Sequence, residues 1–85
     1  MTPFAVEWPP EILSSLAAIW LRAPDRQAVT DAQQRIDDLL SRNPLGNGRH
    51  LSEGLYRLDV RPLAVVYSVD SGRRHVKIES IGELA

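Results

Sequence analysis

The period of the hydrophobic positions changes along this chain. Near the N-terminus, Phe4, Val6 and Trp8 alternate with less apolar residues, and a period of two is typical of a β-strand. Pro9-Pro10 ends this strand and opens a helix, because proline is tolerated in a first helical turn. The chain is therefore predicted to begin with a short strand that leads directly into a helix.

Two helices are predicted from apolar positions that recur at steps of three and four residues. The first follows Pro9-Pro10, and the second runs from about Pro24 to Ser41. Their connection is short, so they should form an antiparallel hairpin, which the turn-rich segment 43–48 ends. The apolar stripes consist of Ile12, Leu13, Leu16, Ile19 and Trp20 in the first helix, and of Val29, Ala32, Ile36, Leu39 and Leu40 in the second.

Three further strands are predicted in the C-terminal half. The segment 55–60 alternates, with Arg57 and Asp59 on the polar face, whereas 63–69 is almost wholly apolar, as expected for a central strand. Asp70–Arg73 predicts a hairpin turn, and the last strand, 75–81, should turn Val76 and Ile78 inward.

These elements predict an α+β fold with the order β-α-α-β-β-β. The helical hairpin should pack on one face of a small antiparallel sheet, and the first strand should pair with the far edge of that sheet. The 85 residues, of which 44% are hydrophobic, are enough for one small domain spanning residues 1–85.

Composition excludes several classes of site. The chain has no cysteine and two histidines, so disulfides, thiolate sites, thiol catalysis and a His-rich metal centre are not expected. No metal or cofactor is predicted. The apolar runs are too short to cross a bilayer, and the N-terminus lacks the pattern of a signal peptide. We therefore expect a cytoplasmic protein without a membrane partner.

Charge is unevenly distributed although the net charge is only −1. Residues 49–77 carry six Arg or Lys against three acids, and residues 1–43 carry four Arg against six acids. A mildly basic strand region beside an acidic helical region predicts a polarised surface. Its basic members are candidates for contact with nucleic acid or a protein partner: Arg49, Arg57, Arg73, Arg74 and Lys77.

Several ordered stretches together resemble one known family. They are "ILSSLAAIW", "AVTDAQQRIDDLLSRNPLGNG", "GLYRLDV" and "PLAVVYSVD", preceded by a strand ending in Trp8-Pro9. This order, from Phe4 to Ile81, resembles the RelE/ParE toxin superfamily of type II toxin–antitoxin, or plasmid stabilisation, systems. The resemblance implies a growth-inhibiting toxin that binds a cognate antitoxin. It further implies either a ribosome-dependent mRNA endonuclease (an mRNA interferase) or a DNA gyrase inhibitor.

The resemblance also assigns positions to the basic residues of the nuclease members. Arg57 fits the basic position on its strand, whereas Asp59 occupies the next such position. Ala64 stands where the third strand of the family carries arginine, and a C-terminal arginine falls near Leu84. Three of the four cationic positions are therefore not filled, which makes enzymatic activity an open question.

RNA cleavage of this kind needs cations for the phosphorane charge and a group that moves a proton. Arg57 and His75 are the catalytic candidates, and Arg49, Arg73 and Arg74 offer further cations, with His50 as a second proton carrier. The alternative is a degenerate toxin or protein-binding module without catalysis. A homodimer and a plain structural domain also remain open.

Each candidate has a purely structural interpretation. The turn 73–75 fits a solvated hairpin tip that discourages edge pairing, and Arg57 with Asp59 fits a surface ion pair of small energy rather than a phosphate clamp. His50 is expected in a loop. The larger aromatic residues, Tyr67, Trp8 and Trp20, are expected in the core or sheet.

Overall fold

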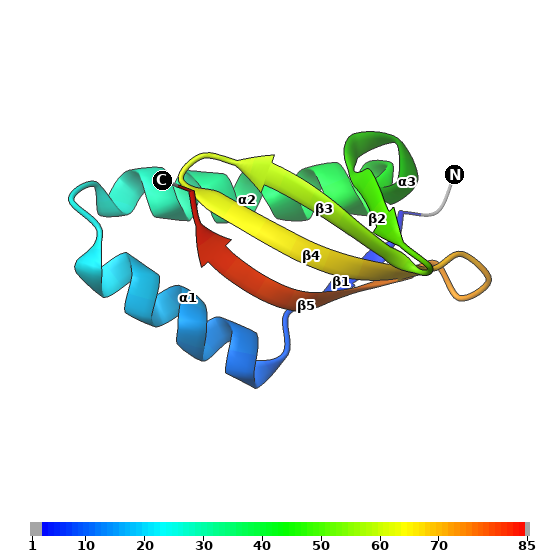
Figure 1. Ribbon diagram of the computed structural model, residues 1–85, viewed down its shortest axis with the longest axis horizontal. Coiled ribbons are helices and arrows are strands. Elements are labelled where there is room, and N and C mark those ends of the chain that lie inside the picture. The colour runs from blue at the N-terminus through cyan, green and yellow to red at the C-terminus, as the bar shows by residue number, and fades with distance from the viewer. Residues whose placement is uncertain (1–2, 85) are drawn as a thin grey trace.

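The computed structural model describes residues 3–84 as helices on one side of a five-stranded sheet. In Figure 1, α2 passes behind the strands, and the other face of the sheet is turned toward the viewer. The strand order is β1-β5-β4-β3-β2. The elements are β1 (Ala5–Glu7), α1 (Pro10–Arg22), α2 (Arg26–Arg42), α3 (Pro44–Asn47), β2 (Arg49–Ser52), β3 (Leu55–Val60), β4 (Leu63–Asp70) and β5 (His75–Glu83).

The predicted order of elements is confirmed, and three details differ. β1 pairs with β5 in parallel, so the sheet is mixed rather than antiparallel. The turn-rich segment forms a short helix, α3, and the next four residues form an additional edge strand, β2, paired with β3. All four residues of Arg49–Ser52 are exposed, and the segment has no alternation of hydrophobic and polar residues. Its strand conformation therefore depends on backbone pairing with β3.

The helices are placed by their sequences. Pro10 occupies the first turn of α1, where a missing backbone N–H costs nothing. Asp25 caps α2, its carboxylate accepting a hydrogen bond from the Ala28 N–H at 3.0 Å. No helix in residues 3–84 is long and apolar enough to cross a membrane.

The core lies between the two long helices and the strand residues that face them. β4 is the central strand, and its side chains at 63, 65 and 67 have no exposed surface. Val76 and Ile78 of β5 point inward as predicted. The remaining buried hydrophobic residues are Ile12, Leu16, Ile19, Val29, Ala32, Ile36, Leu40 and Leu58.

Trp20 corrects the prediction that both tryptophans lie in the core. Its side chain is exposed on α1, and the guanidinium of Arg26 lies 4.8 Å from the ring centroid. Trp8 is partly buried against the core, and its indole Nε1 donates a hydrogen bond to Asp37 at 2.9 Å. The helical period placed Trp20 in the apolar stripe of the first helix, but the sheet and α2 do not cover that side of α1, and Trp20 is 38% exposed.

Candidate functional site

The face of the sheet turned away from the helices, here called the open face, carries the candidate residues of the strands. Because side chains alternate along a strand, the residues beside Leu58, Val65 and Ile78 project to the opposite side. The register places on this face Arg49 of β2, Arg57 and Asp59 of β3, Ala64, Val66 and Ser68 of β4, and Lys77, Ser80 and Gly82 of β5.

Arg49 and Arg57 stand directly opposite each other across the β2–β3 pair. Directly opposed residues of antiparallel strands are about 5 Å apart at their Cα atoms. The side chains of Arg49 and Arg57 therefore lie in the same region of the open face. They line a hollow of about 340 Å³ together with Asn47, Gly48, Leu58 and Asp59. This hollow therefore contains two arginines and one aspartate.

Arg57 is held within the hollow by an acid of its own strand. Its Nε donates to Asp59 Oδ1 at 2.7 Å, and its terminal nitrogen lies 3.5 Å from Oδ2. The hydrogen bond to Asp59, followed by the coulombic attraction of that carboxylate, raises the pKa of Arg57 above its ordinary value. Asp59 therefore occupies the side of the Arg57 guanidinium that Nε and one terminal nitrogen form, one of the faces with which this group binds oxyanions.

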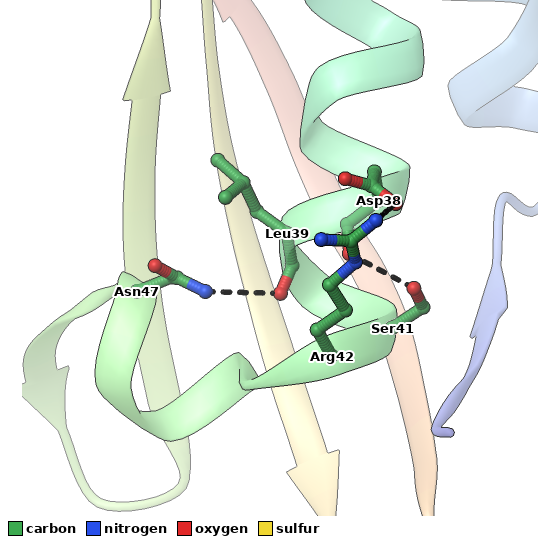
Figure 2. Close-up of polar contacts among 5 residues, drawn as sticks. All are labelled: Asp38, Leu39, Ser41, Arg42 and Asn47. Atoms are coloured by element: carbon green, nitrogen blue, oxygen red, sulfur yellow. Dashed lines mark hydrogen bonds and ion pairs between the residues drawn. The ribbon is translucent and has the colours of Figure 1, made fainter.

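The rim of the hollow depends on the junction between α2 and α3, drawn in Figure 2. The side-chain amide of Asn47 donates to the Leu39 carbonyl at 3.1 Å, and Ser41 Oγ donates to the Asp38 carbonyl at 2.9 Å. The Leu39 carbonyl also accepts a hydrogen bond from the Asn43 backbone N–H at 3.0 Å. The Asn47 amide is therefore a second donor to this carbonyl, and it ties α3 to the end of α2 shortly before Arg49.

Tyr67 holds the same junction from the core side. Its hydroxyl donates to the Pro44 carbonyl at 2.6 Å, and a Cβ at Gly48 would lie only 1.7 Å from that hydroxyl oxygen. Glycine is thus required where the backbone passes over the phenol. Burial, followed by the nearby Tyr56, raises the pKa of Tyr67 to about 12. Tyr67 is a core residue, as predicted, and not an accessible phenol.

His50 does not lie in a loop as predicted, because it is a residue of β2. It pairs with Tyr56 on the helix side of the strand, with ring centroids 5.2 Å apart in an edge-on arrangement. Arg49 and His50 therefore point to opposite faces of the sheet. Only Arg49 joins the hollow.

A second basic group lies at the β4–β5 turn. Arg73 is 3.9 Å from Asp70, and Arg74 adopts a φ of 51° with its guanidinium 4.5 Å from the Phe4 ring centroid. His75 Nε2 lies 3.1 Å from Glu7 of β1. These contacts tie the turn to the first strand, and Lys77 follows on the open face of β5.

The two catalytic candidates are not brought together. His75 pairs with Asp70, four residues along β4 from Val66, which pairs with Arg57. At about 3.3 Å per residue and 4.8 Å per strand, the Cα atoms of Arg57 and His75 are roughly 16 Å apart. A single phosphodiester at the hollow would not contact both side chains. Among residues 3–84, no group of three potential metal ligands occurs.

The positions assigned by resemblance do converge. Asp59 pairs directly with Ala64, which pairs in turn with Gly82. Nearby, the Leu84 N–H donates to the Pro62 carbonyl at 2.9 Å. One end of the open face therefore presents an acid and two small residues beside Arg57, and no cation reaches it from those positions.

Helix α1 has exposed hydrophobic residues that the sequence pattern did not distinguish from buried ones. Leu13 and Leu21 of α1 are 45% and 62% exposed, and with Trp20 they form a stripe beside the buried one, here called the α1 stripe. Trp20 and Leu21 follow Leu13 by seven and eight residues, so the three side chains share one side of the helix. The sequence did contain one indication of this exposed stripe, because Leu21 is hydrophobic but falls outside the predicted buried stripe.

Comparisons with known proteins bear on the fold. No protein-family model matches the chain, and no curated protein matches it. A chain of the toxin–antitoxin complex RelBE2 from Mycobacterium tuberculosis superposes with a TM-score of 0.73 at 21% identity, over 95% of this chain and 98% of that one.

Two structures of the E. coli toxin RelE are also similar. A double arginine-to-alanine mutant in the free state gives a TM-score of 0.65 at 17% identity, covering 98% of this chain and 84% of that one. The isolated toxin gives 0.57 at 14% identity, covering 100% and 86%. The predicted architecture is thereby confirmed, and the chain has the fold of the RelE toxins.

Proposed function

We propose that this chain is the toxin component of a type II toxin–antitoxin system of the RelE/ParE superfamily and that it binds a cognate antitoxin in the cytoplasm. The observation that carries the proposal is the likeness to a chain of the RelBE2 toxin–antitoxin complex, which extends over nearly the whole of both chains. A shared fold alone hosts many functions. The surface of α1 adds an independent argument for a protein partner.

The α1 stripe is the proposed docking surface for an apolar face of the antitoxin. Three of the five large hydrophobic residues exposed in residues 3–84 lie in it, namely Leu13, Trp20 and Leu21. Clustered exposed hydrophobic side chains mark interaction sites more than scattered ones do. Arg26 flanks the stripe, whereas Arg22 is already paired with Glu83 at 2.6 Å. An acidic residue of the antitoxin segment beside Arg26 would complement this edge of the stripe.

Binding is tested with the product of a short reading frame adjacent to the gene. We expect a stable complex, and we expect Leu21→Glu to weaken it at least about tenfold, because a charge replaces a desolvated contact. The matched control is Leu45→Glu, since Leu45 of α3 is also exposed, at 48%. Absence of a complex, or equal weakening by both variants, would contradict this docking surface.

We infer that growth inhibition by this chain does not depend on RNA cleavage. The separation of Arg57 from His75 and the ion pair of Arg57 with Asp59 support a binding role on the open face rather than catalysis. Expression without the antitoxin should arrest growth while ribosome-bound messages stay intact by primer extension. Cleaved messages that disappear in Arg57→Ala would favour the endonuclease instead.

A further inference from the structure

An asparagine followed by a glycine, Asn47-Gly48, lies where helix α3 passes into strand β2. The backbone nitrogen after an asparagine can attack the side-chain amide, and glycine permits the closest approach because it has no Cβ. The other asparagine of the chain, Asn43, precedes Pro44. Proline has no backbone N–H, so Asn43 cannot react in this way.

We propose that Asn47 is a site of spontaneous deamidation, and that the reaction releases α3 from the end of α2. The Gly48 nitrogen forms a bond to Asn47 Cγ, the bond from Cγ to Nδ2 breaks, and ammonia leaves with the proton of the Gly48 nitrogen. Water then opens the resulting cyclic imide at either of its two carbonyls. The product is aspartate or isoaspartate, and nothing is oxidised or reduced.

The packing of the core requires the glycine that makes Asn47 reactive. A Cβ at Gly48 would lie 1.7 Å from the Tyr67 hydroxyl oxygen, and this hydroxyl donates a hydrogen bond to the Pro44 carbonyl. A larger residue at position 48 would slow the attack but would conflict with this contact. The reactive dipeptide is therefore a consequence of the way α3 packs on Tyr67.

The folded protein slows the reaction without preventing it. Asn47 Nδ2 donates to the Leu39 carbonyl at 3.1 Å, and Figure 2 shows the amide directed toward that carbonyl. This bond must break before Cγ can turn toward the Gly48 nitrogen. Because α3 has four residues and Asn47 is exposed, local opening of this turn and entry of water need no global unfolding.

The product can no longer make the contact that joins the two helices. A carboxylate only accepts hydrogen bonds, so at position 47 it would repel the Leu39 carbonyl oxygen. It also adds one negative charge to a chain whose net charge is −1. Isoaspartate further adds one carbon to the backbone next to Gly48, where the chain passes over the Tyr67 hydroxyl.

The test is peptide mapping of the purified chain after incubation at mildly alkaline pH. Trypsin cleaves after Arg42 and Arg49, so one peptide contains both asparagines. We expect fragment masses to place an exchange of the amide NH₂ for a hydroxyl at Asn47 alone, with a sample taken before incubation as reference. An unchanged peptide from the folded chain, after the urea-unfolded chain has been converted, would overturn the proposal, and so would a change at Asn43.

Two variants at position 47 separate the chemistry from its structural effect. Asn47→Gln keeps the amide, but its longer side chain closes a six-membered ring much more slowly, so we expect no conversion. Asn47→Asp carries the product and should lower the Tm by about 4 °C, as the loss of one hydrogen bond does in a domain of this size. An unchanged Tm would contradict the release of α3.

The dependence on opening of α3 is tested with Tyr67→Phe. This variant removes the hydrogen bond to the Pro44 carbonyl and should speed the conversion of Asn47 about threefold, since α3 is held less firmly. The matched control is Ser68→Ala, which removes a side-chain hydrogen bond to Glu79 on the same strand but away from α3. Equal rates in the two variants would overturn the role of α3.

This inference goes beyond the proposed toxin role, because the reaction consumes only water. Its experiments use the chain alone, whereas the proposed function is tested with the antitoxin and in growing cells. Failure of one proposal is in this way distinguishable from failure of the other.

Discussion

The two faces of strand β4 differ in their surroundings, because one face packs into the core and the other is partly exposed. Leu63, Val65 and Tyr67 face the helices without exposed surface, whereas Ala64 and Val66 between them are partly exposed on the open face. Substitutions on the buried face should act on stability. Substitutions on the open face are free to change affinity, and the predictions below use this difference.

The largest expected loss of stability comes from Gly48→Ala. The new Cβ would lie 1.7 Å from the Tyr67 hydroxyl oxygen and 2.7 Å from its ring carbon. Because that phenol is buried and hydrogen-bonded to Pro44, either it or α3 must shift, at a cost of about 3 kcal/mol in unfolding free energy. Urea unfolding followed by circular dichroism measures the loss.

Gly82→Ala is the control for Gly48→Ala, because a Cβ there meets nothing within 4 Å. It should leave the urea midpoint unchanged or slightly raised. Tyr67→Phe in the Gly48→Ala background should restore part of the lost stability, since it removes the nearest atom. Equal losses at the two glycines would mean that the contact with Tyr67 is not the cause.

Adjacent valines on β4 compare the faces directly. Val65→Ala removes two methyl groups from a site with no exposed surface and should cost about 2 kcal/mol. Val66→Ala removes the same groups from the open face and should cost less than about 1 kcal/mol. Thermal or urea unfolding of both variants measures the two losses in free energy of unfolding. Equal losses would show that the open face is covered in solution.

We expect the free energy of unfolding to depend on pH in the alkaline range because of Tyr67. Its pKa is raised from 10.0 to about 12 in the folded protein, so the unfolded chain loses the phenolic proton first. Stability from this group is present below pH 10 and is lost as the pH rises toward 12. The difference in Tm between the parent and Tyr67→Phe should shrink across that window. A constant difference would mean that the phenol titrates normally.

The smallest effect on stability is expected for Arg57→Ala. Its partner is exposed and belongs to the same strand, and exposed ion pairs contribute little. Tm should be the same as in the parent within measurement error. A clear fall in Tm would place Arg57 among the residues that build the fold and would weaken the contrast between the faces.

Most of the fold could be predicted because its elements carry their own periodic signal. The alternation in 55–60 placed Leu58 inward and Arg57 outward, and Val76 and Ile78 proved buried as expected. β2 and α3 were missed. Arg49–Ser52 is exposed throughout, and a strand held only by backbone pairing leaves no hydrophobic pattern to detect.

The candidate site was less predictable than the fold, since distance along the chain says little about distance in space. Arg49 is eight residues before Arg57 and still lies directly opposite it. His75 belongs to the same sheet, yet lies two strands away and toward the far turn. The catalytic role of Arg57 and His75 stays a prediction, for which this arrangement offers no common centre.

The sequence by itself determined the contacts that are local: the helical stripes, the Asp25 cap, and the meeting of Arg57 with Asp59 at a spacing of two on one strand. The tertiary structure alone decided which surfaces remain open. It set Arg49 beside Arg57, left Leu21 uncovered on α1 and separated His75 from the hollow. The physical reason is that periodicity fixes the direction of a side chain relative to its own element, while sheet register and helix packing fix which elements meet.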